Sequence, residues 1–221
     1  MSVNVHPSYE PIALSDESTV VAEYLPETDT ETSYQSEAEL EREFIKQLRA
    51  QAYEYLPFKA EDELIANLRR QLQRLNAIEF SDAEWDRFYA ACISGANDGI
   101  LEKTTRIQDD YIQVLKRDNG TSRNIYLLDK KKIHNNFVQV INQYEAQGKR
   151  ANRYDVTVLI NGLPLVHIEL KRRGVELREA FNQIERYQRE SFWAGTGLFE
   201  YVQLFVISNG THTKYYVYTV R

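Results

Sequence analysis

The sequence is poor in cysteine, in long apolar runs and in the residues that mark fibrous chains. Its 221 residues include one cysteine, five prolines and nine glycines, which excludes a collagen-like chain and a disulfide scaffold. Cys92 cannot form a disulfide within the chain, so we expect a small buried hydrophobe in a reducing, cytoplasmic setting. The longest apolar run is far short of the roughly 18 residues that cross a bilayer, and the N-terminus lacks a signal-peptide pattern. We expect no membrane partner.

Several ligand-binding motifs are also missing. The sequence contains no Gly-x-x-x-x-Gly-Lys-Ser/Thr phosphate loop, because Gly148-Lys149 is followed by Arg150 and has no upstream glycine. The chain itself should therefore not bind ATP as a motor. His134 and His167 are not spaced with Cys92 or with an acid as metal ligands, so we interpret both as structural. The sequence also has no helix-turn-helix or zinc-finger pattern, the usual signals of base-specific recognition, which agrees with a function that does not depend on reading a sequence.

The charge is divided unevenly along the chain. The net charge is −6, yet residues 1–43 hold eleven acids and one base, Arg42, so this leader carries −10 and the rest carries +4. Residues 1–35 show little periodicity, and we interpret them as an acidic, poorly packed arm with a short strand near Ile12–Leu14. A mildly basic body permits nucleic-acid binding without requiring it.

The pattern over residues 36–221 predicts one domain, with a helical part over about 36–100 and an α/β core over about 104–221. Helices are expected from Ser36 onward, at 61–75, at 81–94 with a Ser81/Glu84 capping box, and at 176–193. Strands are expected at 111–115, 124–128, 137–144, 154–160, 163–170, 201–207 and 214–220. This order predicts an α/β fold, with a mixed, largely antiparallel central sheet flanked by helices and preceded by a helical part.

The hairpin around Asn161-Gly162 carries the most informative polar residues. Glu169 and Lys171 point to the same side of their strand because side chains alternate. Whether Asp155 joins them depends on the turn. A two-residue loop pairs Asp155 with Ile168 and turns it away, whereas a three-residue loop with a left-handed Gly162 pairs it with His167. We predict the three-residue loop or an equivalent bulge.

Two acids and a lysine on adjoining strands can support phosphodiester hydrolysis. Facing carboxylates repel each other and gain from a divalent cation between them, and hard oxygen ligands favour Mg²⁺ or Mn²⁺ over zinc. A nearby ammonium can orient the attacking water or stabilise charge on a phosphate. The alternative is an edge hairpin with ordinary solvated charges. The spacing of Asp155, Glu169 and Lys171 does not decide between the two.

Asp155 followed after fourteen positions by Glu169-Leu170-Lys171 resembles the PD-(D/E)xK nuclease signature, although no proline precedes Asp155. From about residue 36 onward, the chain more specifically resembles the N-terminal nuclease domain of the restriction and translocation (R) subunit of type I restriction-modification enzymes. That resemblance rests on these stretches in order: Gln108–Leu115, Asn135-Asn136-Phe137, Asn142-Gln143, Asn161–Leu165 and Ile207–Gly210. It implies a restriction-endonuclease-like fold in which Asp155 and Glu169 bind Mg²⁺, with Mn²⁺ able to substitute, and Lys171 assists cleavage of double-stranded DNA.

The same resemblance assigns further residues. It places Gln183 and Tyr187, four positions apart on the helix after the core, near the cleavage site; alternatively, Tyr187 is a core aromatic and Gln183 a surface residue. Related nucleases often add an acid from an N-terminal helix. Glu41 fits best, because it lies on the apolar stripe with Glu37, whereas Glu43 lies outside it; alternatively, Glu41 reaches solvent at the edge of the stripe.

Two basic clusters are candidates for contacts with phosphates. Arg172 and Arg173 extend the catalytic strand, and we expect them to contact DNA. Lys130–Lys132 follows a strand end and is interpreted chiefly as a solvated loop.

The resemblance also implies a larger setting. We expect an N-terminal fragment of a longer motor subunit, with ATP used only in the absent motor region and with methyltransferase and specificity subunits as partners. The rival hypotheses are a non-catalytic nuclease-like module that binds DNA or docks other parts, and another PD-(D/E)xK enzyme such as a repair nuclease. A complete Asp155, Glu169 and Lys171 set on one face favours the enzyme.

Overall fold

The structure is a computed structural model that describes residues 13–14, 18–24, 36–95, 97–146, 152–190 and 197–218. Most of the predicted arm, the last three residues of the predicted helix 176–193 and the last two of the predicted strand 214–220 lie outside the described residues. None of the helices in the described ranges is long and apolar enough to cross a membrane.

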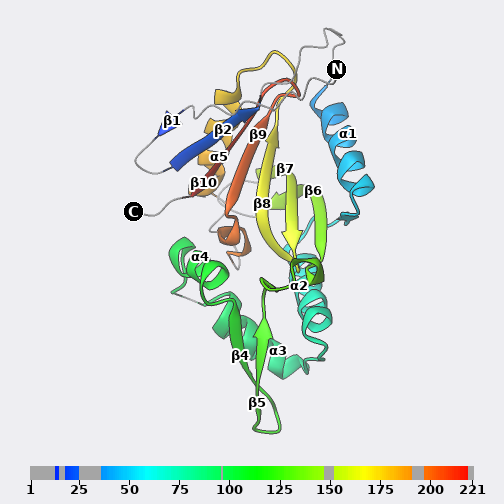
Figure 1. The fold of residues 1–221 in the computed structure, drawn as a ribbon, viewed down its shortest axis with the longest axis vertical. Helices are drawn as coiled ribbons and strands as arrows, with labels where there is room; N and C mark the ends of the chain where they lie inside the picture. The colour runs from blue at the N-terminus through cyan, green and yellow to red at the C-terminus, as the bar shows by residue number, and fades with distance from the viewer. Residues whose placement is uncertain are drawn as a thin grey trace, which may run out of the picture.

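Eight strands of the described residues form one twisted sheet in the order β1-β2-β10-β9-β8-β7-β6-β3 (Figure 1). The neighbours β8–β9 and β3–β6 are parallel and the other neighbours are antiparallel, so the predicted mixed, largely antiparallel sheet is confirmed. The strands are β1 Ala13–Leu14, β2 Ser18–Tyr24, β3 Glu54–Tyr55, β6 Val138–Ala146, β7 Asn152–Ile160, β8 Leu163–Leu170, β9 Leu204–Ser208 and β10 Thr213–Tyr218.

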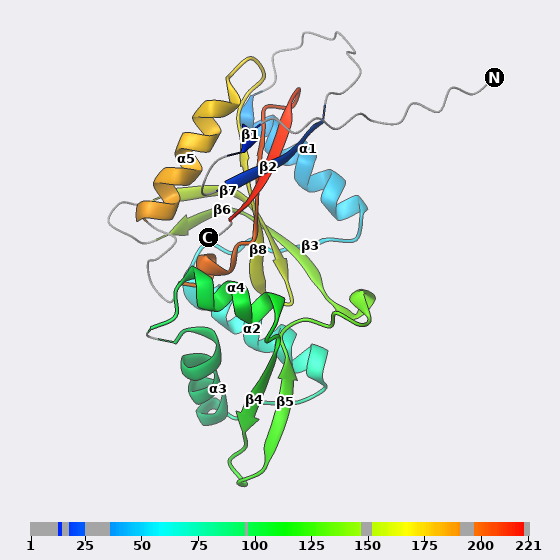
Figure 2. The same ribbon diagram turned by 60° about the vertical axis from the view of Figure 1, so that its left-hand side comes forward.

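Two amphipathic helices cover opposite faces of this sheet (Figure 2). Helix α1, Glu37–Ala50, packs Ile45 and Leu48 onto one face, against a cluster that comprises Val140, Val156, Val158, Ile168 and Leu170. Helix α5, Leu177–Glu190, packs on the other face through Ala180, Ile184 and Tyr187. Both helices therefore bury the apolar stripe that their sequence spacing predicts.

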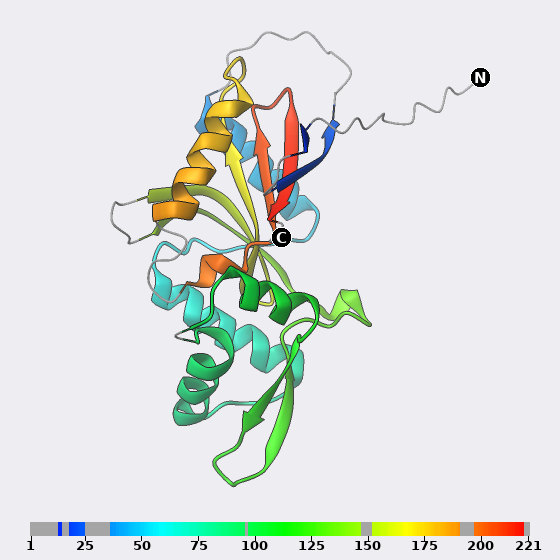
Figure 3. The same ribbon diagram turned by 90° about the vertical axis from the view of Figure 1, so that its left-hand side faces the viewer.

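The helical part lies at one end of the sheet together with a separate two-stranded sheet (Figure 3). It comprises α2 Glu61–Asn76, α3 Asp82–Phe88, the π-helical turn η1 Tyr89–Ile93 and α4 Ile100–Gln108, followed by β4 Ile112–Lys116 and β5 Ser122–Tyr126. The predicted hairpin around Asp118–Gly120 is thus confirmed, but it lies outside the central sheet. Leu115 and Ile125 are buried in the core shared with the helices, which holds the hairpin there.

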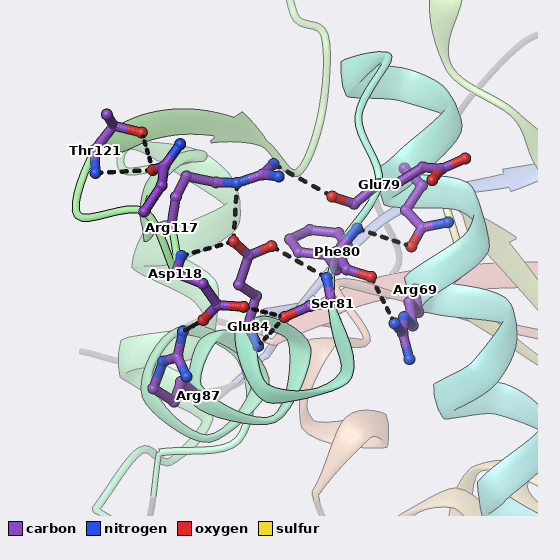
Figure 4. Close-up of polar contacts among 11 residues, drawn as sticks. Arg69, Glu79, Phe80, Ser81, Glu84, Arg87, Arg117, Asp118 and Thr121 are labelled. Carbon is purple, nitrogen blue, oxygen red and sulfur yellow. Dashed lines mark hydrogen bonds and ion pairs between the residues drawn. The ribbon is translucent and has the colours of Figure 1, made fainter.

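A polar network fastens the tip of this hairpin to α3 (Figure 4). The predicted cap is present, because the Ser81 hydroxyl accepts from the Glu84 N–H. The buried Glu84 carboxylate in turn accepts from the Asp118 N–H at 2.9 Å and pairs with Arg117 Nε at 2.9 Å. These contacts satisfy a carboxylate that would otherwise be costly to bury.

Several elements differ from the sequence prediction, and the short strand β3 is one that was not predicted. Helix α4 was not predicted, because its inward face includes a lysine, Lys103, which is buried through its ion pair with Glu200. The expected strand 201–207 begins only at Leu204, since Leu198–Tyr201 forms the 3-10 turn η3 that follows Gly197. The strand predicted near Ile12–Leu14 corresponds to β1, but β2, which pairs with β10, was not predicted.

Candidate active site

The turn between β7 and β8 sets the position of the candidate catalytic residues. Asn161 and Gly162 have φ values of +51° and +86° and form a two-residue turn, because Ile160 pairs with Leu163. The three-residue loop that we expected is therefore wrong. A bulge exists instead, since Leu159 pairs with Pro164 while Val158 pairs with Val166, which leaves Leu165 as the extra residue.

This bulge brings position 155 opposite position 169. Val156 pairs with Ile168, and the same register continued by one residue places Asp155 across from Glu169. The expected pairing of Asp155 with His167 is wrong, because His167 pairs with Thr157. The alternative that we predicted, an equivalent bulge that corrects the register, is confirmed.

The Asp155 carboxylate is held in an environment that disfavours its charge. Burial and the neighbouring Glu169 raise the pKa of Asp155 from 3.8 to about 7, with a further contribution from Glu41. The N–H of Leu170, which donates to Oδ2 at 2.9 Å, and the Lys171 ammonium oppose this increase. A bound cation would relieve the repulsion that remains.

One carboxylate oxygen of Glu169 accepts a hydrogen bond, and the other accepts none from the described residues. Its side chain is fully buried, and Oε1 accepts from the Lys171 ammonium at 3.0 Å. Within the described residues, Oε2 has no hydrogen-bond partner; the His167 Nε2 atom lies 3.6 Å away. His167 was predicted to be structural, and it lies edge-on to the rings of Tyr154 and Tyr187 in the core. The open carboxylate oxygen is the sort of buried acceptor that a metal ion satisfies.

A chain of hydrogen bonds from α5 holds Lys171 in place. Lys171 Nζ donates to Gln183 Oε1 at 2.8 Å, Gln183 Nε2 donates to the Tyr187 hydroxyl, and that hydroxyl donates to the Arg153 carbonyl at 2.9 Å. Burial, with the charge of Glu169, raises the pKa of Tyr187 to about 12, so the hydroxyl keeps its proton. The structure thus joins the two alternatives for Tyr187, which is a core aromatic and also fixes the lysine.

Glu41 lies near the pair but faces other partners. It is buried on α1, as its place on the apolar stripe predicts, and its oxygens accept from Asn142 Nδ2 at 2.5 Å and from Gln143 Nε2. Glu37, the other acid on the predicted stripe, is exposed. Sequence reasoning did not identify Asn142 and Gln143 as partners of Glu41. The sequence does contain a signal for this contact. A carboxylate on the apolar stripe of a helix needs hydrogen-bond donors, and the adjacent amides Asn142 and Gln143 on β6 can supply them.

The strand-end arginines are exposed. Arg172 and Arg173 follow β8, and the backbone N–H of Arg172 donates to Glu37 Oε1 at 3.3 Å, which ties the strand end to α1. Contact of Arg172 and Arg173 with DNA stays a prediction.

The residues present fit Mg²⁺ better than a metal that needs a full protein cage. Among the described residues, no three His, Cys, Asp or Glu side chains are grouped to hold a metal, and a ligand role for Glu41 stays a prediction. Mg²⁺ commonly takes one or two carboxylates and completes its shell with water and substrate phosphates. Asp155 and Glu169 could supply those two carboxylates.

Comparison with known proteins identifies the family. The model of the type I restriction enzyme R protein N terminus matches residues 34–221. The chain belongs to this family. It is 53% identical over 213 residues to the type I restriction enzyme EcoprrI endonuclease subunit of Escherichia coli, which covers 96% of this chain and 68% of that protein.

Staphylococcal relatives of this R protein N-terminal family are much longer than the chain. A type I restriction enzyme endonuclease subunit of Staphylococcus saprophyticus is 42% identical over 187 residues, and one of Staphylococcus aureus is 39% identical over 189 residues. The matches span 82% and 83% of this chain but only 19% and 20% of those proteins. The family resemblance inferred from the short sequence stretches is therefore confirmed.

Proposed function

We propose that this chain is the Mg²⁺-dependent endonuclease domain of a type I restriction enzyme R subunit, and that it hydrolyses phosphodiester bonds of double-stranded DNA without its own sequence readout. The observation that carries the proposal is the pair formed by the half-buried Asp155 and the buried Glu169 beside the fixed Lys171 ammonium. Family membership supports the same reading, because the relatives are named endonuclease subunits.

Each of these residues would have a separate role in the reaction. Asp155 and Glu169 would hold the ion, which when bound supplies Lewis-acid stabilisation of the phosphate and a more acidic water. Lys171, anchored between Glu169 and Gln183, would orient the attacking water or stabilise the negative charge that builds up on the attacked phosphate as the bond to the leaving sugar oxygen breaks. Tyr187 would keep Gln183 aligned, because its hydroxyl is itself fixed by the Arg153 carbonyl.

The proposal also includes the longer subunit and the complex in which the chain would act. The chain would act within a longer R subunit whose motor uses ATP to translocate DNA, in a complex with methyltransferase and specificity subunits that choose the target. The length of the staphylococcal relatives supports a subunit of that size.

Titration calorimetry of the 221-residue chain with Mg²⁺ and with Mn²⁺ tests the metal site. Binding by the parent should disappear in Asp155→Ala and in Glu169→Ala, because each variant removes one of two carboxylate ligands. Asp62→Ala, which removes an exposed acid at the start of α2, is the matched control and should bind as the parent does. Circular dichroism checks the fold of every variant.

Equal heats in all four proteins would contradict the metal site in the free chain. Repeating the titration with duplex DNA present then separates an enzyme from a scaffold. An enzyme should gain an ion whose binding depends on Asp155 and Glu169 when phosphates complete its shell, and a scaffold should not.

Cleavage by the full-length subunit in its complex tests the lysine. Lys171→Ala should abolish DNA cleavage while leaving the fold intact, and Lys46→Ala, at an exposed lysine of α1, should leave cleavage unchanged. Cleavage retained in Lys171→Ala would remove the lysine from the mechanism. Loss of folded structure would instead assign it a structural role.

A further inference from the structure

The segment 111–137, which includes the β4–β5 hairpin and the loop Lys130–Asn135, carries an excess of basic residues that the proposed mechanism does not use. Residues 111–137 contain six lysines and arginines against two aspartates, and one of the six, Arg117, is paired with Glu84 from outside the segment. We define the basic loop as Lys130–Asn135, all of whose residues are exposed. An excess of positive charge on one segment needs a structural explanation or an anionic partner.

Both acids of this segment are engaged by neighbouring groups of the chain. Asp118 accepts from the Ser81 hydroxyl and from Arg87 Nη2, each at 2.5 Å, at the tip of the hairpin (Figure 4). Asp129 accepts from the backbone N–H groups of Lys131 and Lys132 at 3.1 and 2.8 Å, so its charge is used inside the loop. Among the described residues neither carboxylate forms an ion pair with a lysine ammonium group, although the positive charge of Lys132 helps to lower the pKa of Asp129.

The basic loop is fastened to the turn of the catalytic hairpin. Asn136 Oδ1 accepts from the Asp129 N–H and from Asn161 Nδ2, each at 2.8 Å. The other end of the Asn161 amide accepts from the Phe137 N–H at 2.8 Å. The Asn135-Asn136-Phe137 and Asn161-Gly162 stretches therefore build one support, which fixes the backbone of the lysines relative to β7 and β8.

The three lysines have different environments. The Lys130 ammonium donates to the Gln108 carbonyl and lies 4.7 Å from the centroid of the Tyr111 ring. Within the described part of the chain, no hydrogen bond or ion pair engages the ammonium groups of Lys131 and Lys132. Two exposed cations thus stand on a backbone whose conformational freedom is already restricted, which lowers the entropy cost of holding an anion there.

We propose that Lys131 and Lys132 bind backbone phosphates of duplex DNA at a contact surface outside the cleavage site. The inference rests on the proposed function only in taking DNA as the partner. Contacts between lysines and phosphates displace condensed counterions, so binding here is independent of DNA sequence and falls steeply as salt rises. Through Asn136 and Asn161, the surface would hold DNA in a fixed relation to the catalytic hairpin.

Fluorescence anisotropy with the 221-residue chain and a labelled duplex of about 30 base pairs tests this surface across a salt series. The buffer contains EDTA, so neither metal binding nor cleavage contributes. In Lys131→Gln/Lys132→Gln the slope of log K against log salt should become shallower by about 0.9 for each lysine, and affinity near 0.1 M salt should fall about fivefold to tenfold per lysine.

Two further variants separate a local contact from total charge. Lys131→Arg/Lys132→Arg keeps both charges and should retain the parent slope. Lys46→Gln/Arg49→Gln removes the same charge from the exposed side of α1 and should also retain it. Thermal unfolding confirms that each variant is folded.

The proposal would be overturned if Lys131→Gln/Lys132→Gln kept the salt slope of the parent chain. It would also be overturned if the α1 control lost as much slope and affinity as this variant, or if the parent chain did not bind the duplex. If the salt slope of Lys131→Gln/Lys132→Gln is unchanged, the anionic partner of these lysines is not DNA, and an acidic protein surface is the partner to test next. None of these results depends on Asp155 or Glu169, so failure here leaves the metal titrations to judge the endonuclease proposal separately.

Discussion

Substitution of Gly162 by alanine should be far more damaging than the same change at a solvent-facing glycine. Gly162 has φ +86°, a left-handed conformation that costs a residue with a Cβ about 1–2 kcal/mol. An added Cβ would also lie 2.6 Å from the Cα and 3.1 Å from the N of Leu68. These atoms belong to the backbone of α2 and cannot rotate away, so the helix or the catalytic hairpin must shift.

Gly120 and Gly174 provide matched controls. Their φ values are +81° and +83°, and an added Cβ at either one meets nothing within 4 Å. Each Gly→Ala change there should lower the free energy of unfolding by about 1–2 kcal/mol from backbone strain alone. Gly162→Ala should lower it by a further 1–3 kcal/mol, roughly, because overpacking a rigid core costs that much.

Urea unfolding followed by circular dichroism measures the three losses under identical conditions. The difference between Gly162→Ala and the mean of the two controls isolates the clash with Leu68, since the conformational strain is common to all three. Equal losses at the three positions would refute the reasoning. They would mean that the β7–β8 turn and α2 are not in rigid contact.

Two other predictions concern buried charge. Between about pH 4 and pH 7 the folded metal-free chain should keep a proton on Asp155 that the unfolded chain releases, because the folded pKa is raised to about 7. The free energy of unfolding should therefore fall with rising pH by up to about 1.4 kcal/mol per pH unit from this group, and Asp155→Asn should remove that contribution in urea titrations at each pH; an unchanged slope would contradict it. Lys103→Met should destabilise the fold by about 3–5 kcal/mol in thermal or urea unfolding, because Glu200, whose oxygen lies 2.5 Å from Lys103 Nζ, stays buried without its partner. Glu200→Gln added to Lys103→Met should recover most of the loss, and a double variant no more stable than the single one would show that the charge is not the cause.

Local patterns were sufficient for the elements that are amphipathic by themselves. Helices α1, α2 and α5 bury the stripes that their apolar spacing predicts, and the Ser81 cap begins α3 where the sequence places it. The same reasoning failed for α4, because Lys103 interrupts its apolar stripe. Burial of this lysine is tolerated only because it forms an ion pair with Glu200, which belongs to a distant segment. A buried ion pair is a property of two segments, so a pattern within one segment cannot predict it.

The sequence by itself determined which residues could do chemistry: the order of acids and lysine, the Asn-Gly turn and the family stretches all lie in local composition and spacing. Only the tertiary structure decided that Asp155 and Glu169 meet. The one-residue bulge at Leu165 reverses the side to which every following residue points, and turn sequence alone allowed more than one register. Packing also decided that Gln183 and Tyr187 hold Lys171, and that Glu41 turns toward Asn142 and Gln143, because those contacts join segments whose distance depends on how the whole sheet and its two helices pack.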